Sequence, residues 1–128
     1  MKKKLVLTFF ILLIFSVVNL NAENIKINFI QENGNKIEKE YDSSKGPLVL
    51  FDTESMKTVS IENLGVFKSV KILELQQLSF LESLDFLDMF PNLEELYIGY
   101  GVKYSTVNLK NLKKLKLVEL SDKKIILK

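Results

Sequence analysis

The 128-residue sequence contains no cysteine, histidine, arginine or tryptophan. Without cysteine the chain can form no disulfide and no thiolate metal site, and without histidine it lacks the usual general base near neutral pH. Catalysis would have to rest on carboxylates, lysine, serine or tyrosine. These absences argue against an enzyme, and we expect neither a cofactor nor a metal ion.

Three features that could carry chemistry or bind nucleotides have simpler explanations. Asp85 and Asp88 stand three residues apart, and a solvated helix face explains them better than an acid pair or a weak cation site. The segment Gly99-Tyr100-Gly101 lacks the later glycine and the strand, loop and helix context of a phosphate-binding loop. The lysine-rich C-terminal part has no arginine and few aromatic residues, so we expect no nucleic-acid partner.

The first 22 residues have the pattern of a secretory signal peptide. Lys2, Lys3 and Lys4 precede an apolar run over residues 5–18, and residues 19–22 follow as a cleavage region. The run is shorter than the roughly 20 residues of a membrane-spanning helix. We therefore expect an exported protein, periplasmic or extracellular, with no stable membrane span after cleavage. An uncleaved N-terminal anchor is the alternative. The absence of cysteine in an exported chain favours a bacterial source.

The part after the signal peptide divides into two predicted regions. Residues 23–47 alternate apolar and polar side chains on both sides of Glu32-Asn33-Gly34-Asn35, which predicts a β-hairpin followed by a loop. An isolated hairpin is marginal in water, so we expect it to cap the domain formed by residues 48–128. Within that domain, Leu48-Val49-Leu50-Phe51 predicts a short buried strand, and Ile125-Ile126-Leu127 predicts a last edge strand.

One short phrase, apolar-x-x-Leu-x-apolar, recurs in the second region. It occurs at residues 70–78, 93–101 and 112–120, with a looser match at 56–64. The central leucines of the three clear matches are Leu73, Leu96 and Leu115, which are 23 and 19 residues apart. Regular spacing of this length indicates a repeat architecture with one strand in each repeat.

A helix is predicted between the first two clear matches. Ser79, followed three residues later by Glu82, is a capping box that starts a helix. Phe80 and Leu84 lie on the apolar face of this helix, and Pro91 ends it. We expect the helix to cross the convex side of a repeat.

Two stretches of the chain resemble repeat starts of bacterial leucine-rich repeat proteins. They are Phe90-Pro91-Asn92-Leu93-Glu94-Glu95-Leu96-Tyr97-Ile98 and Leu109-Lys110-Asn111-Leu112-Lys113-Lys114-Leu115-Lys116-Leu117. The resemblance covers about half of the chain after the signal peptide. It implies an α/β fold: a short leucine-rich-repeat-like solenoid of parallel strands with the N-terminal β-hairpin as a cap. The chain departs from the family where the motif carries asparagine or cysteine, since Leu78, Gly101 and Leu120 stand there.

The resemblance also implies a binding role for the concave face of the sheet. Strand side chains alternate between faces, so the apolar residues of each phrase should point inward and the residues between them outward. The predicted inward residues are Leu73, Leu75, Leu96, Ile98, Leu115 and Leu117. One predicted outward row is Ser60, Glu74, Tyr97 and Lys116, and the row beside it is Thr58, Ile72, Glu95 and Lys114. The predicted partner-binding residues are Ser60, Ile72, Glu74, Glu95, Tyr97, Lys114 and Lys116.

The function implied is that of an exported module that binds a protein or peptide, whose identity the residues do not reveal. The alternative is a structural or self-associating envelope protein with no discrete ligand site. Acidic residues outnumber lysines up to Glu95, and lysines outnumber acidic residues from Tyr97 onward. Opposite charges in the two halves could support head-to-tail self-association.

Overall fold

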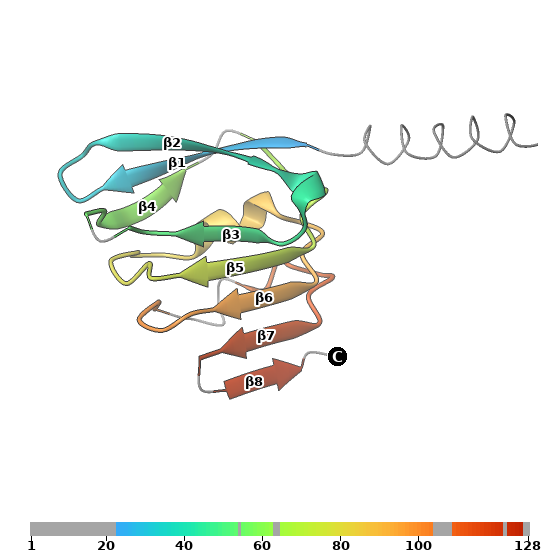
Figure 1. Cartoon of the computed structure of the whole chain (residues 1–128). Helices are drawn as coiled ribbons and strands as arrows, with labels where there is room; N and C mark the ends of the chain where they lie inside the picture. The colour runs from blue at the N-terminus through green and yellow to red at the C-terminus, as the bar shows by residue number, and fades with distance from the viewer. Residues whose placement is uncertain (1–22, 54, 63–64, 104–108, 122, 127–128) are drawn as a thin grey trace, which may run out of the picture.

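The computed structural model describes residues 23–53, 55–62, 65–103, 109–121 and 123–126, which form two β-sheets and two short helices (Figure 1). The first sheet has the strand order β2-β1-β4, and the second has the order β3-β5-β6-β7-β8. The predicted signal peptide lies outside the described residues. None of the helices within these ranges is long and apolar enough to cross a membrane.

The first sheet contains the predicted hairpin. Strands β1 (Asn24–Gln31) and β2 (Lys36–Asp42) pair antiparallel, and Gly34 adopts a φ of 87° in the turn between them. Glycine has no Cβ and reaches this left-handed region without strain, which is why the turn forms here. Three alternate apolar residues of β1 point to the core and are fully buried: Ile25, Ile27 and Phe29.

Strand β4 (Thr58–Glu62) also belongs to the first sheet, where it pairs antiparallel with β1. The prediction of a looser repeat strand at residues 56–64 is therefore wrong. Ser60 stands opposite Ile30, and the fully buried Thr58 stands opposite Gln31. Neither Ser60 nor Thr58 lies in a row with outward residues of the other sheet. The residues at 56–64 fit the apolar phrase because any half-buried strand alternates in the same way.

The second sheet is largely parallel. Its strands are β3 (Leu48–Phe51), β5 (Ile72–Gln76), β6 (Glu95–Ile98), β7 (Leu117–Leu120) and β8 (Lys123–Ile126). The first four run in the same direction, and β8 turns back antiparallel to β7. The predicted strand at 48–51 and the predicted edge strand are thus confirmed, except that Leu127 lies outside the described residues.

The register of the parallel strands repeats at nearly constant intervals. Leu48, Leu73, Leu96 and Val118 stand opposite one another on neighbouring strands. They follow one another in the sequence at intervals of roughly 22 to 25 residues, within the range of strand-containing repeats. The interval from Leu73 to Leu96 contains β5 and a segment that crosses behind the sheet, whereas the interval from Leu48 to Leu73 contains β4 of the first sheet as well as β3.

The last of these strands is displaced from its predicted position. Leu96 pairs with Val118 rather than with Leu115, so the strand begins three residues later than expected. An odd shift exchanges the two faces of a strand. Val118 is consequently buried, and Leu117, which we expected inside, is half-exposed on the outer face. Leu115 remains buried, but in the turn before β7.

The segment crossing behind β5 and β6 is not the predicted α-helix. Within the described part of this crossing, the only helix is η2 (Asp85–Met89), a 3-10 helix. The predicted capping box is absent because the backbone N–H of Glu82 donates to the carbonyl oxygen of Val59 at 3.0 Å. Phe80, expected on the buried face, is 47% exposed. A short 3-10 segment, η1 (Ser43–Lys45), precedes β3.

The crossing is built on a three-residue spacing of buried side chains. Every third residue is buried, namely Leu78, Leu81, Leu84, Leu87, Phe90 and Leu93, and Phe86 is the one further buried residue of the crossing. Backbone N–H groups donate to the carbonyl three residues earlier at Leu81, Leu87, Phe90 and Leu93. This spacing matches the 3.0 residues per turn of 3-10 geometry, in which residues i and i+3 lie on one side, rather than the 3.6 of an α-helix.

The hairpin lies next to β3, at one end of the parallel sheet (Figure 1). The Lys39 ammonium group donates to the carbonyl oxygen of Phe51 at 3.3 Å and lies over the rings of Phe29 and Phe51. At the start of β1, Glu23 accepts a hydrogen bond from the backbone N–H of Ser69 at 2.8 Å. The contact of Lys39 joins the first sheet to the end of β3, and the contact of Glu23 joins it to the segment before β5.

The turn after β6 depends on two glycines. A side chain at Gly99 would place its Cβ 2.8 Å from the carbonyl oxygen of Leu75, which already accepts the Gly99 N–H at 2.7 Å. Gly101 has a φ of 84°. Close backbone approach and positive φ both favour glycine, so these two residues allow the sharp turn after β6.

We expect Leu96→Ala to lower the free energy of unfolding by about 2 to 5 kcal/mol, because Leu96 is fully buried and the change leaves a cavity. Chemical denaturation measures this change. The control is Val66→Ala, at a side chain that is 57% exposed, which should change stability by less than about 0.5 kcal/mol. Similar stabilities for the two variants would contradict the assignment of Leu96 to the core.

Candidate functional site

The outward face of the parallel sheet is the candidate binding surface. Register places two rows of side chains across β5, β6 and β7. The first row is Glu74, Tyr97 and Glu119, and the second row is Ile72, Glu95 and Leu117. All six residues are half-buried, and neighbouring strands hold them in fixed positions. We call these six residues the sheet face.

Four of the seven predicted site residues lie together on the sheet face. They are Ile72, Glu74, Glu95 and Tyr97. Ser60 is in the other sheet, as described above. Lys114 and Lys116 precede β7 and do not belong to its rows, so their predicted positions beside Glu95 and Tyr97 are wrong. Leu117 and Glu119 occupy those positions instead.

A signal for the two missed residues is present in the sequence. Leu109, Leu112, Leu115 and Val118 continue the three-residue spacing that leads into β6. Leu112 and Leu115 each donate a backbone N–H to the carbonyl three residues earlier, at 3.0 and 3.3 Å. Extending this spacing makes Val118 the equivalent of Leu96, and Leu117 and Glu119 then point outward.

Negative charge surrounds the tyrosine at the centre of the sheet face. The Tyr97 hydroxyl donates to Glu95 Oε1 over 3.5 Å. The pKa of Tyr97 is raised, first by the loss of solvent around the hydroxyl and then by the negative charges of Glu95 and Glu119. The hydrogen bond to Glu95 and the charge of Glu74 raise it further. The Tyr97 phenol therefore stays protonated and remains a hydrogen-bond donor among the negatively charged carboxylates around it.

A row of charged residues borders the sheet face at the N-terminal ends of the strands. It consists of Lys71, Glu94 and Lys116, each of which directly precedes one residue of the sheet-face row Ile72, Glu95 and Leu117. The Lys71 carbonyl oxygen accepts N–H groups from Glu94 and Glu95 at 2.7 and 3.0 Å. The Glu94 carbonyl oxygen accepts those of Lys116 and Leu117 at 2.8 and 3.2 Å. Backbone hydrogen bonds thus fix the order of this row.

The side chains of Glu94 and Lys116 form an ion pair of 2.8 Å. The hydrogen bond and the charge of Lys116 lower the pKa of Glu94, and the same contact raises the pKa of Lys116. The Lys116 side chain is 71% exposed, so water and salt screen the pair and a ligand carboxylate can compete for the lysine.

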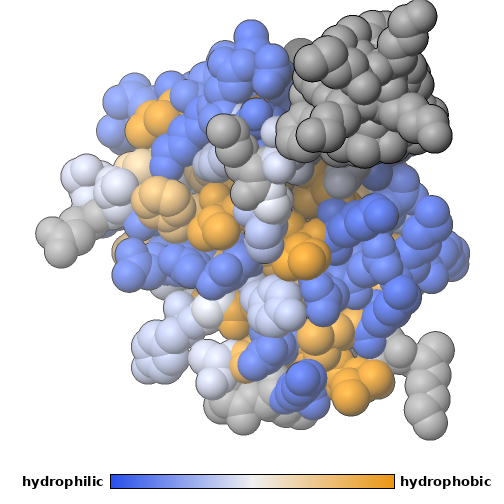
Figure 2. All heavy atoms as spheres, turned by 45° about the vertical axis from the view of Figure 1, so that its right-hand side comes forward, coloured by the Kyte–Doolittle hydropathy of each residue, from blue (hydrophilic) through white to orange (hydrophobic). Residues whose placement is uncertain are grey.

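Three overlapping hollows follow this border from β3 to β7. The first, of about 220 Å³, is lined by Ser43, Gly46, Pro47, Leu48, Ser69, Val70, Lys71 and Ile72. The second, of about 360 Å³, is lined by Lys71, Ile72, Glu94, Glu95, Lys116 and Leu117. The third, of about 500 Å³, is lined by Lys71, Asn92, Glu94, Lys113, Lys114, Leu115 and Lys116. We call these three neighbouring hollows, which share Lys71 in their linings, the edge groove. Figure 2, turned toward this end of the strands, shows apolar surface among hydrophilic side chains.

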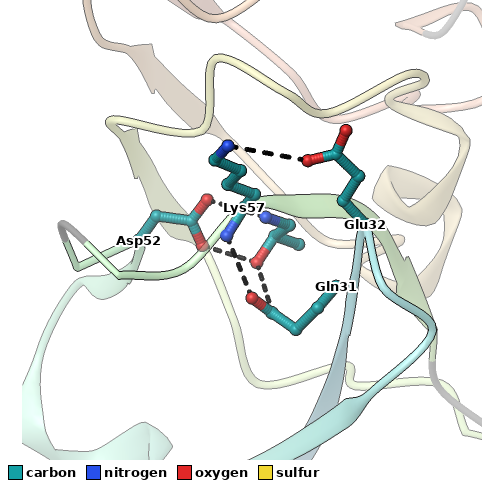
Figure 3. Close-up of polar contacts among 5 residues, drawn as sticks. Gln31, Glu32, Asp52 and Lys57 are labelled. Carbon is teal, nitrogen blue, oxygen red and sulfur yellow. Dashed lines mark hydrogen bonds and ion pairs between the residues drawn. The ribbon is translucent and has the colours of Figure 1, made fainter.

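A buried polar cluster lies between the two sheets, away from the sheet face (Figure 3). The Asp52 carboxylate accepts the hydroxyl of Thr58 at 2.5 Å and its backbone N–H at 3.0 Å. The Gln31 amide donates to the Thr58 hydroxyl at 3.0 Å and accepts the backbone N–H of Lys57 at 3.0 Å. Since Asp52, Thr58 and Gln31 satisfy one another, the cluster joins β1, β4 and the end of β3 as a structural contact.

Residues that could hold a metal ion do not gather in the described part of the chain, where no group of three or more carboxylates converges. Comparison of the chain with protein-family models, with curated proteins and with solved structures found no match.

We expect the double variant Glu95→Gln, Glu119→Gln to lower the pKa of Tyr97, because two negative charges that oppose its ionisation are removed. Nuclear magnetic resonance of ¹³C-labelled tyrosine follows each phenol separately during a pH titration. The control, Glu38→Gln with Glu40→Gln on β2, should leave the titration of Tyr97 unchanged. An unchanged Tyr97 pKa in the first variant would contradict the charge distribution described here.

Proposed function

We propose that this protein is an exported leucine-rich-repeat-like module that binds a protein or peptide through the outward face of its parallel sheet. The observation that carries the proposal is the sheet face itself. Tyr97 lies between the carboxylates Glu74 and Glu119 of its own row, and the apolar side chains Ile72 and Leu117 lie in the neighbouring row. In the described structure, no other element covers these half-buried side chains.

The spacing of the strands supports the repeat assignment. Leucine-rich repeats combine one strand with a helix or 3-10 segment in about 20 to 29 residues and line a horseshoe with their strands. The parallel strands β3, β5, β6 and β7 recur at such intervals, and the crossing before β6 contains the 3-10 helix η2. The hairpin beside β3 supports the role of a cap, since terminal repeats need protection of their open end.

The pattern of the first 22 residues supports export. Strand β1 starts at Asn24, so the strands of both sheets all follow the expected cleavage region. Cleavage after Ala22 would therefore leave the two sheets intact. A bacterial periplasmic or extracellular location agrees with a domain that holds its sheets together without cysteine.

The chemistry of the sheet face suits recognition better than catalysis. Tyrosine is enriched at the energetic centres of interfaces because it buries a large ring and retains a hydrogen-bond donor. Side chains on paired strands lose little freedom when a partner binds, which favours affinity. The surrounding carboxylates then select partners by charge. The lack of an enzymatic activity stays a prediction, as does the alternative of a structural, self-associating role.

The test is a pull-down from the source cells with the C-terminally tagged protein and two matched variants. The variant Tyr97→Ala with Leu117→Ser truncates two of the three uncharged side chains of the sheet face and leaves Ile72 in place. The control variant Val66→Ser with Phe80→Ala changes two exposed apolar residues elsewhere. Circular dichroism first establishes that both variants fold.

We expect the parent and the control variant to capture the same protein, and the sheet-face variant to bind it at least about tenfold more weakly. Loss of a central tyrosine commonly costs about 2 kcal/mol or more in binding, which exceeds the 1.4 kcal/mol of a tenfold change. Equal capture by all three proteins would place the binding surface elsewhere. Capture of nothing by any of them would count against a binding role.

A further inference from the structure

The edge groove changes character along its length. At the end near β3 it is formed mainly by apolar and small residues, and Lys71 is the one charged residue of that hollow. At the end near β7 four lysines line it, together with a single acidic residue, Glu94. Because Glu94 is already paired with Lys116, the β7 end carries an excess of positive charge.

Two lysines of the edge groove are exposed and lie outside the Glu94–Lys116 ion pair, although the charge of each also acts on Glu94 and helps to lower its pKa. Among the residues that the structure describes, Lys71 and Lys114 form no ion pair, and both are exposed. Lys71 precedes β5 and Lys114 precedes β7, and strand β6 lies between those two strands in the sheet. A ligand that contacts both must therefore carry negative charges separated along the groove.

From these features we propose that the edge groove binds an extended peptide segment with one apolar side chain followed by carboxylates at the second and fourth positions after it. This proposal rests on the proposed function and specifies the chemistry of the partner. The apolar side chain enters the hollow between β3 and β5, and the carboxylates contact Lys71 and then Lys114 or Lys116.

The dimensions of the groove match this segment. Neighbouring strands lie about 4.8 Å apart, so the distance from the hollow between β3 and β5 to β7 is about 12 Å. An extended peptide covers about 13 Å from one residue to the fourth after it, at about 3.3 Å per residue. Alternate residues of an extended chain share one side, so positions i, i+2 and i+4 all face the groove.

The apolar end also offers an unsatisfied hydrogen-bonding group. Ser69 lines the hollow beside Val70 and Leu48, and its buried hydroxyl has no hydrogen-bond partner in the described part of the structure. The oxygen has almost no exposed surface, so a bound segment reaches it once the Ser69 side chain rotates toward the hollow, and the peptide backbone then offers both donors and acceptors. A ligand with only negative charges lacks the apolar group that this end of the groove accommodates.

A uniform polyanion fits the edge groove less well than a peptide with spaced carboxylates. Glu94 and Glu95 lie between the lysines on the path from β5 to β7. A ligand with closely spaced negative charges would meet both of these carboxylates. The peptide described above brings only the carboxylate of its second position to the step of Glu94, where Lys71 lies on the neighbouring step.

The test uses the exported full chain, labelled with ¹⁵N, and the synthetic probe acetyl-Leu-Ser-Asp-Ser-Asp-amide. A second probe with the same composition, acetyl-Leu-Asp-Ser-Asp-Ser-amide, moves both carboxylates to the opposite side of the extended peptide. A third, acetyl-Leu-Ser-Lys-Ser-Lys-amide, reverses the charge. Chemical-shift changes of the backbone amides during titration give the dissociation constant and the location of binding.

We expect the first probe to shift the amides of Lys71, Ile72 and Lys114 and to bind roughly fivefold more tightly than the second, a difference in the range of one or two exposed charge contacts. The variant Lys71→Glu with Lys114→Glu should weaken the binding of the first probe and strengthen the binding of the third. The variant Lys26→Glu with Lys103→Glu makes the same change in net charge at exposed sites outside the groove and should alter neither.

Equal binding of the first two probes, shifts confined to other surfaces, or no shifts up to millimolar concentration would overturn the proposal. Tighter binding of inorganic polyphosphate than of the first probe at the same amides would also overturn it and identify a polyanion site. If the peptide fails while the sheet-face variant still loses its captured partner, the groove assignment falls and the proposed function stands. If the sheet-face variant retains its partner and the first probe binds, the proposed function must be moved from the sheet face to the groove.

Discussion

The three-residue spacing of buried side chains behind the parallel sheet determines the rest of the structure. At Leu87, Phe90 and Leu93 the backbone bonds back three residues, so each step turns the chain and returns an apolar residue to the core. The number of steps sets where the next strand begins. That starting point fixes the register of the strand and therefore which side chains face outward. The sheet face and the edge groove both follow from this constraint.

Local patterns in the sequence were sufficient for the hairpin, the strand at 48–51 and the strands around Leu73 and Leu96. Each has an alternating or continuous apolar pattern with turn residues beside it. The strand after Leu115 could not be placed in this way, because two overlapping stretches fit the same phrase. Pairing across the sheet decides between them, and it favours the stretch that gives crossings of similar length. Four site residues were correct because their strands were placed correctly, whereas Lys114 and Lys116 depended on the ambiguous one.

The remaining errors have related physical causes. The α-helix was predicted from a capping box and apolar residues whose spacing also suits 3-10 turns, and the short crossing favours the tighter geometry. Ser60 was assigned to the parallel sheet because alternation does not reveal which sheet a strand joins. The contacts that decide this are distant in sequence, above all the buried cluster of Gln31, Asp52 and Thr58. Local sequence patterns thus predict most of the strands, whereas contacts between residues distant in sequence position the sheet face and the edge groove.

The register of β7 is the central structural claim, and cross-linking of introduced cysteines tests it directly in a chain that has none of its own. Residues paired on neighbouring strands have Cα atoms about 4.8 Å apart, within the range that a disulfide can join. The register described here predicts that Glu95→Cys with Leu117→Cys forms a disulfide under mild oxidation, which protects both thiols from alkylation. Preferential cross-linking of Glu95→Cys with Lys114→Cys would contradict it, because that pair belongs to the register in which the lysines lie on the sheet face.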